Sequence, residues 1–350
     1  MSESNQDIPY DAFMLVSFGG PEGPDDVMPF LENVLRGKNV PRERMLEVAQ
    51  HYQGFGGVSP INEQNRQLLE ALKKQFAAEG IDLPIYWGNR NWEPLIPDTL
   101  RQMKADGVQR SLAFFTSMFS CYSGCRQYRE NLIDAQAEIG EGAPRVEKVR
   151  MGFNHPGFIH PMADNVRASL AKLNAPAEST PVLFTAHSIP LSMADFCRYQ
   201  DQLNEAARLV AAEVGIQHYR LVFQSRSGPP QQPWLEPDVC DAIAEMDDKE
   251  KLQNLVIVPI GFVSDHMEVI YDLDDEAAKL CEERGIAMER TATVGTHPEF
   301  IKMICSLVKE RMSENPQREA LGEMGPWHDV CPADCCQYKP VRPGRPTGAT

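Results

Sequence analysis

The chain has 350 residues and a formal net charge of −16 at pH 7. This length exceeds what one hydrophobic core usually organises, so it predicts two domains of ordinary size followed by a tail. The negative charge disfavours general binding to nucleic acid or to an anionic membrane surface, because those partners need a basic patch. An anionic ligand would therefore have to be bound by a local group of arginines.

The N-terminal residues 1–9 (MSESNQDIP) lack the basic and apolar regions of a secretory signal, and no run approaches about 18 apolar residues. We therefore expect a cytoplasmic protein without an integral membrane segment. The nine cysteines are an odd number in a chain without an export signal. They favour thiol chemistry or metal binding over a disulfide framework.

Short apolar, β-rich runs alternate with amphipathic helical stretches along the chain. The candidate strands are 12–18, 83–88, 109–116, 146–152, 181–186, 219–224, 255–262 and 287–294. Such alternation is typical of α/β folds, in which helices cover both faces of a parallel sheet. Four strands followed by four strands predict two doubly wound parallel-sheet, Rossmann-like domains that face each other across a cleft.

The predicted domains are 10–155 and 156–312, followed by a cysteine-rich tail over 313–350. The boundary is placed near 153–160 (FNHPGFIH), where aromatic, His and Pro residues interrupt the pattern. In the first domain, a helix is predicted to begin at Ser59–Pro60 and to end at Gly80. The end of the tail, KPVRPGRPTGAT, is basic and rich in proline, which predicts disorder.

The loops that follow the strands are the expected ligand-binding positions, because open parallel sheets bind ligands at the carboxyl ends of their strands. The pair Gly19–Gly20 follows the first strand, but it lacks the G-x-G spacing and the Walker lysine of a nucleotide loop. His187 follows the fifth strand, where an imidazole can act as a base or bind a metal ion. A histidine satisfied by the backbone is the alternative.

An acidic helix is predicted over 268–276 (EVIYDLDDE), with carboxylates on neighbouring turns. These carboxylates belong to Glu268, Asp272, Asp275 and Glu276. Such a row is ordinarily a solvated face. Because it leads toward a histidine in the same half of the chain, it is also a plausible path for a divalent cation.

Six motifs in this order resemble those of the ferrochelatases, over about residues 10–310. They are 15–21 (LVSFGGP), 56–61 (GGVSPI), 123–131 (SGCRQYREN), 185–190 (TAHSIP), 232–239 (QPWLEPDV) and 259–272 (PIGFVSDHMEVIYD). The resemblance implies an enzyme of haem biosynthesis whose substrates are ferrous iron and a porphyrin. It places His187 and Glu268 at the metal-insertion site, with Asp272, Asp275 and Glu276 as outer carboxylates.

The actinobacterial-type pattern of GGVSPIN and YSGCRQYREN implies coproporphyrin III as the porphyrin. Its four propionates need donors around the cleft, and the porphyrin-binding candidates are Phe18, Arg36, Ser59, Arg126 and Tyr128. Phe18 stands where some relatives have a tyrosine, so it can pack on the macrocycle but cannot ligate iron. Protoporphyrin IX, another divalent metal, or a non-catalytic haem or metal carrier remain alternatives.

The tail resembles that of ferrochelatases with an iron–sulfur cluster. Its cysteines, together with one in the third motif, would supply the four thiolates of a 2Fe–2S cluster: Cys125, Cys331, Cys335 and Cys336. Zinc held with His328, or uncoordinated thiols, are the alternatives, and Cys121 is a possible substitute for Cys125. We expect a monomer that makes transient contact with neighbouring enzymes of the haem pathway.

Overall fold

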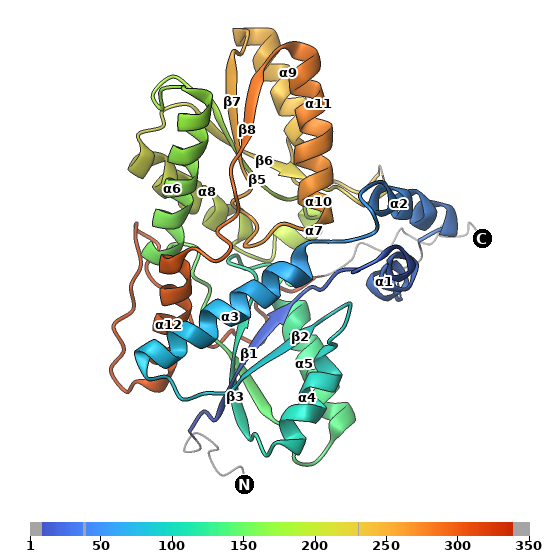
Figure 1. Cartoon of the computed structure of the whole chain (residues 1–350), viewed down its shortest axis with the longest axis vertical. Helices are drawn as coiled ribbons and strands as arrows, with labels where there is room; N and C mark the ends of the chain where they lie inside the picture. The colour runs from blue at the N-terminus through green and yellow to red at the C-terminus, as the bar shows by residue number, and fades with distance from the viewer. Residues whose placement is uncertain (1–8, 38–39, 230, 339–350) are drawn as a thin grey trace, which may run out of the picture.

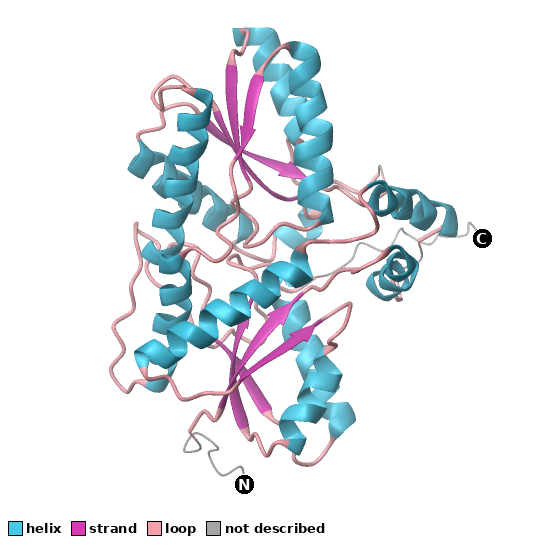
Figure 2. Ribbon diagram, in the orientation of Figure 1, coloured by secondary structure: helices cyan, strands magenta, loops and turns pink. Residues whose placement is uncertain are grey.

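The computed structural model describes residues 9–37, 40–229 and 231–338. The described chain forms two four-stranded parallel sheets with helices on both faces, one above the other in the view of Figure 2. The predicted α/β fold with two doubly wound sheets is therefore confirmed. The end of the tail, 339–350, lies outside the described residues.

The first sheet has the strand order β2-β1-β3-β4 and the second β6-β5-β7-β8, so the two repeat the same topology. All eight predicted strands are present: β1 (Ala12–Ser17), β2 (Ile85–Asn89), β3 (Arg110–Phe115), β4 (Arg145–Lys148), β5 (Val182–His187), β6 (Tyr219–Gln224), β7 (Asn254–Val258) and β8 (Ala287–Arg290). Strand β7 ends four residues earlier than predicted. It stops before Pro259, whose nitrogen cannot donate to a neighbouring strand.

The helices fill the connections between strands. They are α1 (Val27–Val34), α2 (Arg42–Gly54), α3 (Ile61–Glu79), α4 (Ile96–Ala105), α5 (Gln127–Ile139), α6 (Pro156–Leu173), α7 (Leu191–Ala194), α8 (Tyr199–Val214), α9 (Val239–Glu250), α10 (Met267–Val269), α11 (Ala278–Arg284) and α12 (Pro298–Met312). Three further segments are the 3₁₀ turn η1 (Pro24–Asp26) and the π-helical η2 (Tyr122–Arg126) and η3 (Ile270–Ala277). No helix of the described chain combines the length and apolarity needed to cross a membrane.

Strand β1 shows why the sequence reads as a continuous apolar run. All six of its residues are buried, as expected for a strand covered on both faces. Phe13 and Leu15 belong to the core that contains α3, whereas Met14 and Val16 belong to the core beneath α4 and α5. Alternate side chains thus pack against helices on opposite faces.

The two halves are tied together at their junction. Helix α12, the last in the chain, packs against both α3 and α6, and it lies beside α3 of the first half in Figure 1. Arg150 and Glu310 form a buried ion pair at 2.7 Å near this junction. Such a pair keeps the ends of the two halves in register, because separating it would leave a buried charge unpaired.

Candidate active site

His187 is the last residue of β5, at the carboxyl edge of the second sheet. Its Nδ1 lies 2.5 Å from the carbonyl oxygen of Ser188. Because a carbonyl oxygen only accepts hydrogen bonds, Nδ1 must carry the proton and Nε2 is the free basic nitrogen of the neutral ring. The hydroxyl of Tyr199 donates to the carbonyl of His187 and further fixes the backbone.

Glu268 faces this basic nitrogen. Its Oε2 lies 3.5 Å from Nε2 of His187 and 4.0 Å from Nδ1 of His266, so one carboxylate stands between two imidazoles. Burial lowers the pKa of His266, which keeps that ring neutral near pH 7. The structure therefore brings the two expected metal-insertion residues together and adds His266 beside them.

The acidic segment after Glu268 is not the ordinary α-helix that its spacing suggests. It continues from α10 into η3, whose π-helical turns are wider than α-helical ones. Such π segments are rare and often occur at functional sites. The segment is drawn between α10 and α11 beside the second sheet in Figure 1.

Asp272 is the most perturbed carboxyl group of this segment. It accepts hydrogen bonds from Gln224 and Ser225. Its pKa is raised to about 7, chiefly by burial and to a smaller extent by the neighbouring charges of Glu268 and Glu276. The charges of Glu268 and Glu276 therefore both act on Asp272, and a cation among these carboxylates would relieve that repulsion.

Asp275 stands apart from that row, because the ammonium of Lys279 pairs with it at 2.7 Å. Glu276 is exposed, and its carboxylate adds to the effect of burial in raising the pKa of Tyr271. Of the outer carboxylates named from the sequence, Asp272 thus interacts with both Glu268 and Glu276, whereas Asp275 already has a cationic partner.

On the first sheet, the loop after β1 brings several predicted residues close together. Gly19 has φ +79°, and a side chain on Gly20 would lie 2.7 Å from the Cβ of Ser59. Glycine at position 20 therefore lets the loop approach the start of α3. Ser59 is buried there, and its backbone N–H donates to the carbonyl of Pro21.

Arg90, which the sequence analysis did not single out, lies in the loop after β2. Its guanidinium is 5.9 Å from the ring centres of both Phe18 and Tyr128. Burial lowers its pKa, and none of the described carboxylates forms an ion pair with it. A half-buried cation on two aromatic rings is suited to an anionic group of a flat ligand.

The other predicted porphyrin contacts differ in their surroundings. Tyr128 is buried beneath Arg90, and burial raises its pKa to about 12. Arg36 is exposed just after α1, where it donates to Asn33 at 2.5 Å. Arg126 donates to Glu130 and to the carbonyls of Ala333 and Cys335, so this guanidinium holds the tail.

Helices α1 and α2 form an arm at the junction of the two halves (Figure 1). Phe30 and Tyr52 of the arm share a buried cluster with Met267, the neighbour of Glu268. His51 stacks on Tyr271 of η3, with ring centres 4.1 Å apart. Contacts of the arm thus connect the loops of the first sheet to the acidic segment of the second.

A separate cavity of about 220 Å³ lies between α3 and the loops that follow β7 and β8. Asp265 lines it, but neither His187 nor Glu268 does. Asp265 is also paired with Arg290 at 3.0 Å. The cavity is therefore distinct from the pair of residues that carries the candidate chemistry.

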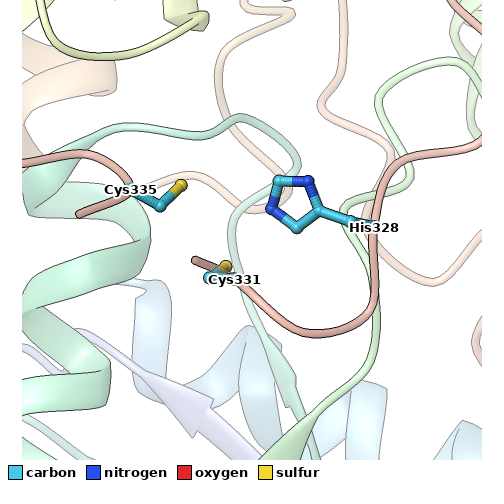
Figure 3. A group of neighbouring side chains, drawn as sticks. All are labelled: His328, Cys331 and Cys335. Carbon is cyan, nitrogen blue, oxygen red and sulfur yellow. The ribbon is translucent and has the colours of Figure 1, made fainter. Parts of the chain in front are cut away.

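The tail brings sulfur and nitrogen donors together near η2. The ligating atoms of His328, Cys331 and Cys335 all lie within 4.8 Å of one another. Figure 3 draws these three neighbouring side chains. A hydrogen bond links the thiols of Cys125 and Cys331; it lowers the pKa of Cys331 and raises that of Cys125. Thiolate and imidazole are the donors that zinc and iron–sulfur centres use, so this donor set fits either.

A family model described as Ferrochelatase matches residues 10–312 of the chain. The chain belongs to the ferrochelatase family. A protein named Ferrochelatase from Rhodopirellula baltica is 71% identical to it over 345 residues, which cover 97% of this chain and 98% of that protein. The predicted enzyme class, metal insertion, is confirmed.

Two further comparisons concern other proteins and structures. A protein named Coproporphyrin III ferrochelatase from Streptomyces coelicolor is 51% identical to this ferrochelatase over 364 residues, covering 97% of this chain and 96% of that protein. The solved structure "SirB from Bacillus subtilis with Fe3+" has a TM-score of 0.55 at 13% identity, covering 87% and 96% of the two chains. At that identity, the second comparison supports the fold alone.

Proposed function

We propose that this ferrochelatase inserts Fe²⁺ into coproporphyrin III, with His187 and Glu268 at the insertion site. The observation that supports this proposal most directly is the distance of 3.5 Å between His187 Nε2 and the carboxylate of Glu268, the first residue of the acidic row. Several relatives at about half identity are named Coproporphyrin III ferrochelatase, which supports the choice of porphyrin. A carrier function lacks such support, because the family is one of metal-insertion enzymes.

The proposed chemistry follows from the tautomer of His187. Each iron that enters the macrocycle replaces two pyrrole protons, which must leave for the solvent. Nε2 is the free base, because Nδ1 is bound to the carbonyl of Ser188. It accepts one pyrrole proton, passes it to the solvent and then accepts the second, and the Glu268 carboxylate stabilises the imidazolium that forms each time.

The proposed path of iron runs along the carboxylates. Oxygen donors bind ferrous iron reversibly, so the ion can exchange its water ligands gradually along the row. Asp272 lies one turn from Glu268 and interacts with its charge. Glu276 extends the row toward the solvent, whereas the pairing of Asp275 with Lys279 makes it the weakest member.

The proposed porphyrin site lies on the loops of the first sheet. Phe18 would pack on the macrocycle, with Arg36, Ser59, Arg126 and Tyr128 as the donors expected from the sequence. The surroundings of Arg90 make it a further propionate partner, since its guanidinium has no carboxylate partner among the described residues. Arg126 contributes through the tail, which its guanidinium holds.

The substrate assignment is tested by comparing kcat/KM for coproporphyrin III and protoporphyrin IX under anaerobic conditions. Wild type should prefer coproporphyrin III, and Arg90→Ala should reduce that preference about tenfold, because one charge-assisted bond to a propionate is lost. Arg36→Ala and Tyr128→Phe test the other candidates, and exposed Arg44→Ala serves as the control. Equal or better use of protoporphyrin IX by wild type would refute the assignment.

We also propose that the tail binds a 2Fe–2S cluster, with Cys125, Cys331, Cys335 and Cys336 as the thiolates expected from the sequence. When bound, the cluster supplies a redox-active cross-link between the tail and η2. Protein made under iron-replete conditions should be red-brown, and Cys125→Ser should lose that colour, whereas Cys240→Ser should keep it. Colourless wild-type protein carrying stoichiometric zinc would contradict the cluster but not the chelatase activity.

The cytoplasmic location, the monomeric state and the transient contacts with other haem-pathway enzymes remain part of this proposal. The division into domains at 10–155 and 156–312 is likewise a prediction. Sedimentation of the purified protein tests the monomeric state, and a stable dimer would contradict it.

A further inference from the structure

Arg290 binds two carboxylates beside the insertion site. It is the last residue of β8, an edge strand of the second sheet, and its side chain is 16% exposed. Its Nε and Nη2 donate to the two carboxylate oxygens of Asp274 at 2.8 and 2.7 Å, and its Nη1 donates to Asp265 at 3.0 Å. One planar guanidinium thus links two aspartates with three charge-assisted hydrogen bonds.

These two aspartates lie on either side of Glu268 in the sequence. Segment 265–276 contains six carboxylates and no lysine or arginine. Neighbouring like charges repel one another, so this stretch depends on cations from elsewhere in the fold. Arg290 supplies one cation to both Asp265, which precedes α10, and Asp274, which lies in η3.

The opposite edge of the sheet holds the same segment. Gln224 is the last residue of β6, the other edge strand, and its amide donates to the carbonyl of Glu268 at 3.4 Å and to the carboxylate of Asp272 at 3.2 Å. His187 ends β5, which lies between the two edge strands. The segment therefore crosses the carboxyl end of the sheet with one anchor at each edge, and Glu268 approaches His187 between these anchors.

The start of the segment also contacts the first half of the molecule. The side-chain oxygen of Gln64, on α3, accepts a hydrogen bond from the backbone N–H of Asp265 at 2.8 Å. This bond is uncharged, so it leaves the repulsion among the carboxylates unchanged. Loss of the Arg290 guanidinium would leave Asp265 and Asp274 without this shared cation, and Glu268 lies between them in the chain.

We propose that Arg290 is a positioning residue for metal insertion. By binding both ends of the segment 265–274, it holds Glu268 opposite His187. The inference rests on the proposed insertion site but not on the identity of the porphyrin. Arg290 takes no part in the reaction itself, and its effect on turnover passes through the Glu268 carboxylate. A displacement of about 1 Å can cost about 100-fold in rate, so such a contact matters for kcat.

A double-mutant cycle with Glu268 tests this role. Arg290→Gln should lower kcat about tenfold, because the amide cannot bind two carboxylates. In the Glu268→Gln background, Arg290→Gln should change kcat less than about twofold, since the carboxylate that it positions is already absent. Turnover is measured anaerobically with the porphyrin that wild type uses best. Porphyrin binding to Arg290→Gln, followed by fluorescence quenching, should stay within about twofold of wild type.

Arg284→Gln is the matched control. Arg284 also binds two aspartates, Asp247 and Asp248, and Asp247 lies near the amino end of β7, away from the insertion site. This variant should leave kcat unchanged. Arg290→Lys keeps the charge but lacks the fork of the guanidinium, so it should lower kcat by a smaller factor than Arg290→Gln. It also completes the cycle if Arg290→Gln does not fold.

The outcomes separate this inference from the proposed function. An unchanged kcat in Arg290→Gln, alongside a reduced kcat in Glu268→Gln, would refute the role of Arg290 and leave the proposed function intact. A loss that multiplies fully with that of Glu268→Gln would also overturn the inference, because Arg290 would then act independently of Glu268. An unchanged kcat in Glu268→Gln would refute the proposed role of Glu268 together with that of Arg290.

Discussion

The acidic segment η3 and the cysteine tail offer iron opposite environments. Glu268, at the head of the first, is 49% exposed and belongs to a row of oxygen donors. Cys125, at the second, is 3% exposed and hydrogen bonded to another thiol. Exposed carboxylates bind a divalent ion weakly and exchange it readily, whereas buried thiolates hold it. The difference agrees with the two proposed roles, in which iron passes through the first site and stays in the second.

The two regions also differ in how the fold supports them. His187 is the last residue of β5, and Glu268 lies in α10, which follows the loop after the neighbouring strand β7. From the end of α12 to residue 338, the tail contains no strand or helix, and side chains such as Arg126, Arg150 and Asn154 hold its backbone instead. A metal centre there would add a cross-link that regular secondary structure does not provide.

The largest effect should come from the insertion site. His187→Ala should lower turnover about 10³-fold or more, because the base that accepts the pyrrole proton is lost. Binding of coproporphyrin III, measured by fluorescence quenching, should stay within about tenfold. Exposed His218→Ala is the matched control and should leave both quantities unchanged. A wild-type turnover rate in His187→Ala would show that His187 takes no part in the reaction.

A smaller loss should follow from Glu268→Gln. The amide keeps the shape of the side chain but cannot stabilise the imidazolium of His187, so kcat should fall about 10- to 100-fold. Glu282→Gln, on the exposed side of α11, is the control. Steady-state rates at saturating iron separate this effect on kcat from weaker binding of iron. An unchanged kcat with a raised KM for iron would mean that Glu268 only helps to bind iron and does not stabilise the imidazolium.

The smallest effect concerns stability and its dependence on pH. Burial raises the pKa of Asp272 to about 7, so folding favours its protonated form. Its destabilising effect is absent below the ordinary pKa near 4 and grows as the pH rises to about 7. Asp272→Asn should therefore raise the free energy of unfolding of metal-free protein by roughly 1 to 3 kcal/mol at pH 8 and by less at pH 5.

Urea unfolding of wild type and Asp272→Asn at the two pH values measures this difference. Asp274→Asn, which removes an exposed partner of Arg290, is the control and should not show the same rise with pH. A stability gain that is equal at pH 5 and pH 8 would mean that the Asp272 carboxyl group is not strained by its charge.

The fold could be predicted from the sequence because buried parallel strands have an unmistakable local pattern. The run Ala12–Ser17 is apolar on both faces, and each such run is followed by an amphipathic helix. The π-helical turns of η3 could not be predicted in this way. Their spacing of acidic residues also suits an α-helix, and the wider turn depends on tertiary packing.

The candidate site was predictable where its residues belong to motifs. His187 and Glu268 each follow a strand, and two strand ends on one sheet edge must lie near each other. Arg90 and His266 were missed, although both stand in loops after strands, at β2 and β7. The sequence cannot show that the Arg90 guanidinium lacks a carboxylate partner among the described residues, or that Arg126 reaches the tail, since both depend on contacts between distant segments.

Two iron isotopes test most directly whether iron passes through the insertion site and stays in the tail centre. Protein whose tail centre is loaded with ⁵⁷Fe would be given coproporphyrin III and natural-abundance Fe²⁺ without oxygen. Mass spectrometry of the product and Mössbauer spectra of the protein would then be recorded. The account predicts that the product contains only the added iron and that the tail keeps its ⁵⁷Fe through many turnovers. Enrichment of ⁵⁷Fe in the product, with matching loss from the tail, would contradict it.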